Sequence, residues 1–357
     1  MQTCVQPPTA ETLRQAADLL SRGQLVAFPT ETVYGLGANA LDADAVLSIF
    51  TAKNRPADNP LIVHIWTADQ LPGLVEISPL AYPLMERFWP GPLTLLMPKK
   101  QMIPEIVTAG LDTVAIRMPS HPVAQALLKE CGLPIAAPSA NRSGRPSPTA
   151  AAHVLEDMDG RIPLIIDGGD CEVGVESTVL DICHGTPCIL RPGGVTQDML
   201  QEVLGQVEVA GSVLRPLREG ETARSPGMRY RHYAPKGQVT LVTGRTDQVL
   251  QALRVLHARA AADNRRVCVM CFEEHAQALS DCNPHVIGRA SDPATVAHRL
   301  FAALRQLDHD GMEVIYSEVL PPEGYGLAVM NRLGRAAAFR TISAEECLQE
   351  QDPTTST

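Results

Sequence analysis

The chain has few aromatic residues, no excess of positive charge and no long apolar run. Only 4% of its 357 residues are Phe, Trp or Tyr, and 30 Lys and Arg stand against 40 Asp and Glu, a formal net charge of -10. This balance disfavours a surface that coats nucleic acid, although it does not exclude a local basic patch. No stretch approaches the ~18 apolar residues of a membrane span, and the N-terminal MQTCVQPPTAETLRQ lacks a signal-peptide pattern.

The nine cysteines are an odd number, are scattered along the chain, and several lie inside apolar runs. This distribution favours reduced, buried thiols in a cytoplasmic protein over a disulfide framework. Cys268 and Cys271 have CxxC spacing, but residues three apart in an apolar strand point to opposite faces, so they cannot share a metal. We therefore expect a cytoplasmic protein without a membrane segment or a zinc site.

Common nucleotide-binding motifs fail on inspection. Residues 35–40, GLGANA, fit the loose dinucleotide pattern G-x-G-x-x-A, and Asp58 lies further on. However, the preceding strand ends near Pro29, the polar TETVY intervenes, and Asp58 sits in the Pro-flanked NRPADNP. We therefore expect no NAD or flavin. No G-x-x-x-x-G-K-[ST] loop occurs either, so a nucleotide must be held by other means.

Helical and strand patterns alternate through the first half of the chain, between Pro- and Gly-rich connections, which predicts an α/β domain over residues 1–211. Helices are expected at 9–22, 42–53, 79–88 and 121–132. Strands are expected at 24–29, 61–66, 93–98, 113–119, 133–138, 163–168, 177–182 and 187–192.

A basic linker separates this half from a second domain. Residues 212–237 include RPLREGETARSPGMRYRHYAPK, with six Arg or Lys against two Glu. Residues 238–345 then repeat strand and helix patterns, which predicts a smaller open-sheet domain. Residues 346–357 are expected to be a disordered tail.

Lys53 and Arg55 form a first candidate site. Because Pro56 follows, we expect extended backbone here, in which residues two apart project to the same side. The two cations would then lie side by side. The alternative is a basic helix end that complements the helix dipole. Asn59 and His64 would flank the start of the next strand.

Ser139 and Asn141 form a second candidate site, where the apolar strand PIAA ends and RSGRPSPT begins. They offer a hydroxyl and an amide at a strand's carboxyl end, although a simple turn-forming pair is the alternative. Arg117, Ser177 and Arg191 also stand at strand ends, and a guanidinium suits carboxylates and phosphates. Together these positions predict a site for an anionic, polyphosphate-sized ligand and a small polar one.

The segments that carry these residues resemble the threonylcarbamoyl-AMP synthase family, whose catalytic domain is the YrdC-like domain. The matching stretches are PTETVYGLG, KNRP with NPLIVHI, FWPGPLTLLM, VAIRMPSHP, APSANRSGRPSPT, GVESTVLD and ILRPGG. SPGMRYRHYAPK and EGYGLAVMNRLGRAA resemble the long, two-domain form. The resemblance implies a twisted mixed-sheet α/β catalytic domain with a deep groove, followed by a Rossmann-like domain.

The resemblance also implies an activity. Members condense L-threonine, bicarbonate and ATP into threonylcarbamoyl-adenylate and release pyrophosphate, with Mg²⁺ carried by ATP rather than by protein side chains. The product passes to a separate transferase complex that modifies tRNA, so stable tRNA binding is not required. Two alternatives stay open at this stage: an RNA-binding or regulatory module, and a carbamoyl-adenylate former for another acceptor.

The family's functional positions carry over onto residues of this chain. The catalytic set implied is Lys53, Arg55, Ser139 and Asn141. The ATP-binding set is Lys53, Arg55, Asn59, Thr113, Ser139, Asn141, Thr149, Arg191 and Tyr233. The threonine-binding set is Thr32, His64, Arg117 and Ser177. A lid is expected from Arg229, Tyr230, Arg231, His232 and Tyr233.

Overall fold

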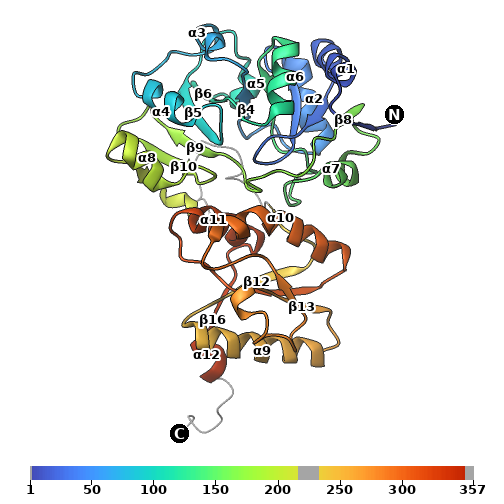
Figure 1. Ribbon diagram of the computed structural model, residues 1–357, viewed down its shortest axis with the longest axis vertical. Coiled ribbons are helices and arrows are strands. Elements are labelled where there is room, and N and C mark those ends of the chain that lie inside the picture. Colours follow the sequence, from blue (N-terminus) through green and yellow to red (C-terminus); the bar gives the residue numbers. More distant parts are fainter. Residues whose placement is uncertain (1, 216–232, 350–357) are drawn as a thin grey trace. The chain divides into compact units, whose positions relative to one another are not determined.

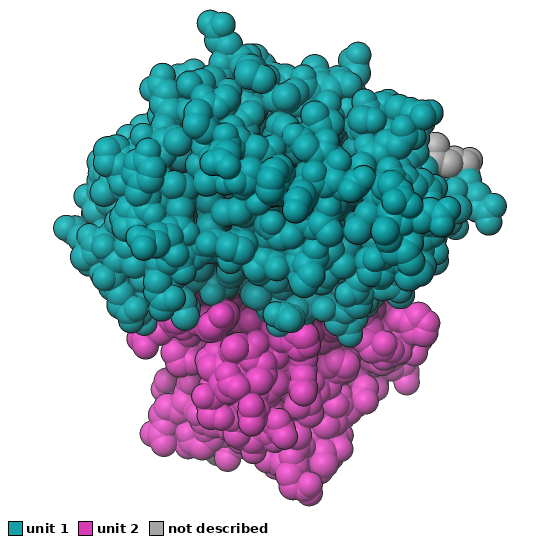
Figure 2. Space-filling view, turned by 45° about the horizontal axis from the view of Figure 1, so that its top comes forward, with its two compact units in different colours: residues 1–143, 147–230 teal, residues 144–146, 231–357 magenta. Residues whose placement is uncertain are grey.

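The computed structural model describes residues 2–215 and 233–349. The chain divides into two compact units, coloured separately in Figure 2. They are residues 1–143 with 147–230, and residues 144–146 with 231–357.

The first unit is built on one mixed sheet of eleven strands in the order β1-β8-β2-β3-β7-β4-β6-β5-β9-β10-β11. Some neighbours are parallel, such as β4 and β6, and others antiparallel, such as β5 and β6. The strands are β1 Cys4–Gln6, β2 Val26–Phe28, β3 Gly35–Asn39, β4 Ile62–His64, β5 Leu93–Pro98, β6 Thr113–Arg117, β7 Ile135–Ala136, β8 Leu164–Ile166, β9 Thr178–Asp181, β10 Cys188–Arg191 and β11 Glu208–Val209.

Local sequence sets the helices of this unit. The Thr9 hydroxyl accepts a hydrogen bond from the Thr12 amide and so caps α1, and Asp42 caps α2 in the same way. Helices α1 and α6 lie side by side over one part of the sheet (Figure 1). The helices are α1 Ala10–Ser21, α2 Ala43–Lys53, α3 Leu71–Leu74, α4 Ala81–Phe88, α5 Glu105–Thr108, α6 Pro122–Cys131, α7 Ala151–Met158 and α8 Gln197–Leu204, with short 3-10 turns at Ala68–Gln70 and Gly211–Val213.

The glycine-containing stretch after TETVY forms strand β3, which was not among the predicted strands. β3 pairs antiparallel with β2 and with β7. A Cβ on Gly37 would stand 2.9 Å from both Ile135 Cγ2 and Phe28 Cε1. The glycine therefore lets apolar side chains pack onto the strand.

The second unit is a smaller three-layer α/β fold. Its five strands are all parallel, in the order β14-β13-β15-β12-β16. Figure 1 shows α9 and α12 on one side of this sheet and α10 and α11 on the other. The elements are β12 Gln238–Thr243, α9 Thr246–Ala262, β13 Val267–Cys271, the 3-10 turn Glu273–His275, β14 Pro284–Val286, α10 Pro293–His309, β15 Val314–Ser317, α11 Tyr325–Ala336, β16 Thr341–Ser343 and α12 Ala344–Gln349.

The fold class expected from the sequence is confirmed: a large mixed-sheet α/β unit and a smaller parallel-sheet unit. The helices predicted from the sequence did not include α3, α5, α7, α8, α11 and α12. The tail expected from residue 346 is wrong for 346–349, which belong to α12, where Ala344 and Cys347 are buried. Within the described part of the chain, no helix has the length and apolar character needed to cross a membrane.

Candidate active site

The first group of site residues is joined through a buried lysine. Lys53 is the last residue of α2 and only 2% exposed, and its Nζ donates to the carbonyl oxygens of Ser139 at 2.5 Å and Asn141 at 2.6 Å. The Ser139 hydroxyl in turn donates to Asn141 Oδ1 at 2.5 Å. Lys53 is therefore in contact with the S-x-N segment, more than 80 residues away in the sequence.

Lys53 and Arg55 do not share extended backbone, so that prediction is wrong. The proline constrains only the residue before it, and Lys53 stays helical because the turn comes at Asn54, a left-handed C-cap with φ of 53°. The Arg55 guanidinium lies 5.7 Å from the centre of the Phe50 ring. The alternative considered above, a basic residue at the helix end, describes Lys53 correctly.

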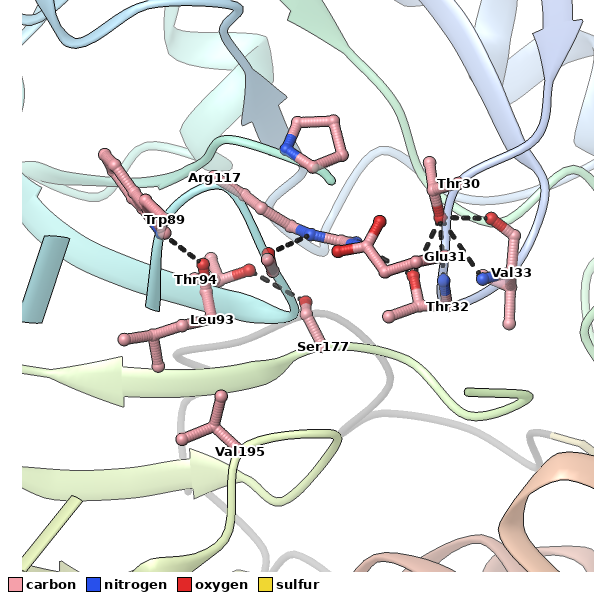
Figure 3. Close-up of polar contacts among 12 residues, drawn as sticks. Thr30, Glu31, Thr32, Val33, Trp89, Leu93, Thr94, Arg117, Ser177 and Val195 are labelled. Carbon is pink, nitrogen blue, oxygen red and sulfur yellow. Dashed lines mark hydrogen bonds and ion pairs between the residues drawn. The ribbon is translucent and has the colours of Figure 1, made fainter. Parts of the chain in front are cut away.

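The second group centres on a buried ion pair that the sequence analysis did not single out (Figure 3). Arg117 ends β6, and its Nη2 lies 2.7 Å from Glu31 Oε1, with both side chains no more than 6% exposed. Arg117 Nη1 donates to the Thr32 hydroxyl at 2.9 Å, and Nε donates to the Gly91 carbonyl at 3.3 Å. Arg117 is thus held by three residues from two segments, the turn that contains Glu31 and Thr32 and the loop at Gly91.

The turn TETV presents Glu31 and Thr32 to this arginine. The Thr30 hydroxyl donates to the Val33 carbonyl at 2.6 Å and accepts from the amides of Thr32 and Val33. Such a hydroxyl-centred turn holds two successive side chains in defined directions. The run of threonines and glutamate is therefore a rigid corner between β2 and β3.

Ser177 and Arg191 extend the second group. Arg191, the last residue of β10, donates from Nη2 to the Ser177 hydroxyl at 3.0 Å and from Nε to its carbonyl at 3.1 Å. The Ser177 hydroxyl also shares a hydrogen bond of 2.8 Å with Thr94 (Figure 3). Arg191 was expected beside Lys53 as a phosphate ligand, but its described contacts are to Ser177.

His64 and Asn59 are buried polar side chains with unused hydrogen-bonding atoms. His64 is 3% exposed, and burial together with the nearby positive charge of Arg117 lowers its pKa to about 3, so its imidazole is neutral. Its Nδ1 has no hydrogen-bond partner among the described residues, and neither have Oδ1 and Nδ2 of Asn59, which is 0% exposed. Buried polar atoms without partners are costly, which points to a ligand that completes them.

The sheet register sets the distance between the two groups. Thr113, Ala115 and Arg117 alternate onto one face of β6, and β4 pairs Ile62 with Ala115 and His64 with Arg117. Thr113 therefore lies about 13 Å from Arg117 along the strand, at about 3.3 Å per residue. The apolar side chains clustered on this face are Ile62, Leu96, Ala115, Val179 and Leu190.

Strand direction places the S-x-N group at the far end. β7 runs antiparallel to β4, with the Ala137 amide bonded to the Ile62 carbonyl. Ser139 and Asn141 follow β7 and so lie toward the start of β4, at the Thr113 end. The polar residues thus form two groups at opposite ends of the strands, and the apolar side chains of the cluster lie between them.

The other predicted residues lie elsewhere or outside the described part. Thr149 is buried before α7, where its amide and hydroxyl approach His153 Nδ1. Tyr233 belongs to the second unit, where its ring lies 5.2 Å from that of Phe301 and beneath the Arg332 guanidinium. The remaining lid residues, 229–232, fall outside the described residues.

Sequence reasoning missed Glu31 and Glu176 as buried acids. Glu31 is 4% exposed, and Glu176, also buried, accepts a hydrogen bond of 2.5 Å from the Ser147 hydroxyl. Each lies beside a residue that was predicted, Thr32 or Ser177. The sequence feature that could have indicated their burial is a single carboxylate beside small polar residues, in a stretch without other charges.

Across residues 2–215 and 233–349, no three or more His, Cys, Asp or Glu side chains gather closely enough to hold a metal ion. Cys268 and Cys271 are both free thiols on β13, and Cys268 Sγ donates to the Asn283 carbonyl.

The structure shows a two-unit α/β protein whose first unit holds two groups of buried polar and charged side chains on one sheet face. A family model described as "Telomere recombination" matches residues 18–193, and one described as "Threonylcarbamoyl-AMP synthase, C-terminal domain" matches residues 195–338. The chain belongs to the threonylcarbamoyl-AMP synthase family, in the long form with both domains, and its members are nucleotidyltransferases.

Individual relatives agree over nearly the whole chain. The threonylcarbamoyl-AMP synthase of Pyrococcus abyssi is 47% identical over 92% of this chain and 95% of its own length. That of Bacillus subtilis is 48% identical over 92% of this chain and 94% of its own length. The crystal structure of P. abyssi Sua5 complexed with L-threonine superposes with a TM-score of 0.90, at 46% identity, covering 96% of this chain and 99% of that one. The family predicted from the sequence is confirmed.

Proposed function

We propose that this protein condenses L-threonine, bicarbonate and ATP into threonylcarbamoyl-AMP and pyrophosphate, for threonylcarbamoyladenosine modification of tRNA. The observation that carries the proposal is the two-ended polar arrangement on one sheet face. One end offers Lys53 with a hydroxyl and an amide, and the other offers Arg117 with Thr32 and His64. The likeness to a relative solved with L-threonine supports an amino-acid site.

At the first end, Lys53 and Arg55 would bind ATP phosphates and offset charge on the leaving pyrophosphate, since such transfers depend on positioning and electrostatics. Ser139 and Asn141 would orient the α-phosphate or the nucleoside, and the unused amide atoms of Asn59 suit the same ligand. Thr113 and Thr149 would complete this end. Arg191 would reach the phosphates from the second group, beside Ser177. Mg²⁺ would enter with the phosphates, where it supplies charge neutralisation.

At the second end, Arg117 would pair with the threonine carboxylate, because a guanidinium donates two parallel hydrogen bonds. His64 is neutral, so Nδ1 can accept a hydrogen bond from the threonine hydroxyl. Thr32 and Ser177 would line the same space. The threonine carbamate that forms is unstable in water, and the buried second group excludes solvent from it. Residues 229–233 would serve as the lid.

The product would pass to a separate tRNA-modifying transferase. The nine free cysteines suit a reducing compartment, and we place the protein in the cytoplasm on that ground.

The test is mass spectrometry of purified protein with ATP, Mg²⁺ and bicarbonate, with and without L-threonine. We expect a threonine-dependent threonylcarbamoyl-adenylate peak and equimolar pyrophosphate. Arg55→Ala should abolish both, whereas Arg22→Ala, at an exposed pair with Asp18, should leave them unchanged. ATP binding without this product in the wild type would refute the proposal.

A further inference from the structure

Glu31 carries a buried carboxylate that belongs to neither the ATP-binding nor the threonine-binding set. It pairs with Arg117 at 2.7 Å, with side-chain exposures of 4% for Arg117 and 6% for Glu31. Neither of its oxygens accepts a hydrogen bond among the described residues, although both are shielded from solvent. Apart from the ion pair, this carboxylate therefore has unused acceptor capacity in a place where that is costly.

A buried pair of this kind is a poor device for stability, because desolvation of two charges offsets their mutual attraction. It is, however, the complement of a free amino acid. A zwitterion carries one carboxylate and one ammonium group, and Arg117 and Glu31 carry the opposite charges within contact of each other. When an amino acid enters, its carboxylate can pair with Arg117 and its ammonium group with Glu31. The site then stays neutral overall, and neither protein charge is left unpaired.

We propose that Glu31 receives the α-ammonium group of the amino-acid substrate and takes up its proton, so that the free amine can react with bicarbonate. The inference rests on the proposed function and adds a residue to it. The Thr30-centred turn that fixes Thr32 also fixes Glu31, one residue away, at the same guanidinium (Figure 3).

The step balances. An ammonium N–H bond breaks and a carboxyl O–H bond forms on Glu31, leaving a neutral amine. The amine nitrogen then forms a bond to the bicarbonate carbon, one C–O bond of bicarbonate breaks, and water leaves with one amine proton. The products are the carbamate and water. The proton on Glu31 passes to solvent after the product departs.

The other titratable groups facing Glu31 cannot easily replace it. They are Arg117 on β6, His121 at the start of α6, and Cys171. A guanidinium is a hydrogen-bond donor without an acceptor atom, so Arg117 offers no base. Burial lowers the pKa of His121, which weakens it as a base, and burial raises the pKa of Cys171 well above its ordinary value, so its thiol stays protonated.

The first test is calorimetric binding of L-threonine and of (R)-3-hydroxybutyrate, which keeps the carboxylate and hydroxyl but lacks the amine. Both are titrated into wild type and Glu31→Gln with a saturating non-hydrolysable ATP analogue. We expect Glu31→Gln to raise the threonine Kd about 10-fold to 100-fold, the usual loss for a hydrogen bond to a charged group. The Kd of 3-hydroxybutyrate should stay the same or fall, because Arg117 is released for its carboxylate.

Equal losses for both ligands would mean that Glu31 only positions Arg117, and the inference fails. Unchanged threonine binding would also overturn it. The inference also fails if Glu31→Gln loses affinity for threonine and does not bind 3-hydroxybutyrate at all, because Arg117 without its partner must accept a carboxylate. Glu11→Gln, on the exposed side of α1, is the matched control, and a thermal melt checks that both variants fold.

The proton-transfer part is tested by the pH profile at saturating threonine. Without Glu31 the amine must lose its proton to solvent, so the Glu31→Gln rate should rise about tenfold per pH unit from 7 toward 9, while the wild type stays flat. A parallel pH dependence in both proteins overturns this part. These outcomes differ from failure of the proposed function, in which the wild type itself makes no adenylate.

Discussion

At the scale of single residues, His64 makes stability depend on pH in a defined window. Its pKa in the folded protein is about 3, below the ordinary value of 6.5, because it is buried near Arg117. Between pH 3 and pH 6.5 the His64 imidazole binds a proton in the unfolded chain but not in the folded protein. The contribution of the neutral imidazole to the free energy of unfolding is therefore fully present above pH 6.5 and is lost as the pH falls toward 3.

We therefore expect His64→Gln to reduce the slope of unfolding free energy against pH by up to about 1.4 kcal/mol per unit in this window. Urea unfolding at a series of pH values measures it. The same substitution at exposed His309 should leave the slope unchanged. A wild-type slope preserved in His64→Gln would show that the imidazole takes no part.

Removing one member of the buried pair should cost more than removing both. Arg117→Met leaves the Glu31 charge buried without a partner, which we expect to cost about 3 to 5 kcal/mol of unfolding free energy. The double variant Glu31→Gln with Arg117→Met should recover most of this loss. Urea unfolding of the three variants gives the values.

The exposed pair Arg22 and Asp18 supplies the comparison, because Arg22→Met should cost at most about 1 kcal/mol. An additive double variant would contradict the coupling we infer for Glu31 and Arg117.

Single positions show what the sequence could predict at this scale. Arg117, Ser177 and Arg191 were expected at strand ends, and the structure places each there. Glu31 was not assigned, because a partner 86 residues away cannot be read from local pattern. Arg191 was assigned to ATP from the family resemblance, and its contact with Ser177, which the β9–β10 pairing brings about, was not predicted.

At the scale of elements, β3 depends on the absence of a side chain. Gly37→Ala should destabilise the first unit by about 1 to 3 kcal/mol, because the added Cβ would stand 2.9 Å from Ile135 and Phe28 in a packed core. Denaturant unfolding measures the change. Gly73→Ala is the control, since a Cβ there meets nothing within 4 Å. Equal effects at both positions would contradict the packing explanation.

Element prediction succeeded where periodicity was strong and failed where geometry is non-local. The strands β5 and β6 and the helices α1 and α2 match their sequence patterns. β3 was not among the predicted strands because its glycines are unfavourable in isolated strands, yet pairing on both sides supplies the missing stability. Lys53 was expected in extended backbone, but the left-handed turn at Asn54 comes one residue later.

For the molecule as a whole, the net charge of -10 disfavours strong binding of tRNA. Phosphate contacts dominate nucleic-acid affinity and require clustered positive charge. We expect threonylcarbamoyl-adenylate to form at the same rate with and without added unmodified tRNA, and no stable tRNA complex in a shift assay at physiological salt. A salt-dependent complex that persists without ATP turnover would favour the RNA-binding alternative.

The order of strands in the first sheet has a consequence for how the chain is made. Among the described strands, β1 pairs only with β8, and β2 pairs with the other side of β8. Residues 4–6 therefore find this partner only when residues 164–166 are synthesised. Contacts of such wide sequence separation close late and slowly. Strand β1 must therefore wait with an unpaired edge until β8 has been synthesised, and in this interval a chaperone would protect the nascent chain from aggregation.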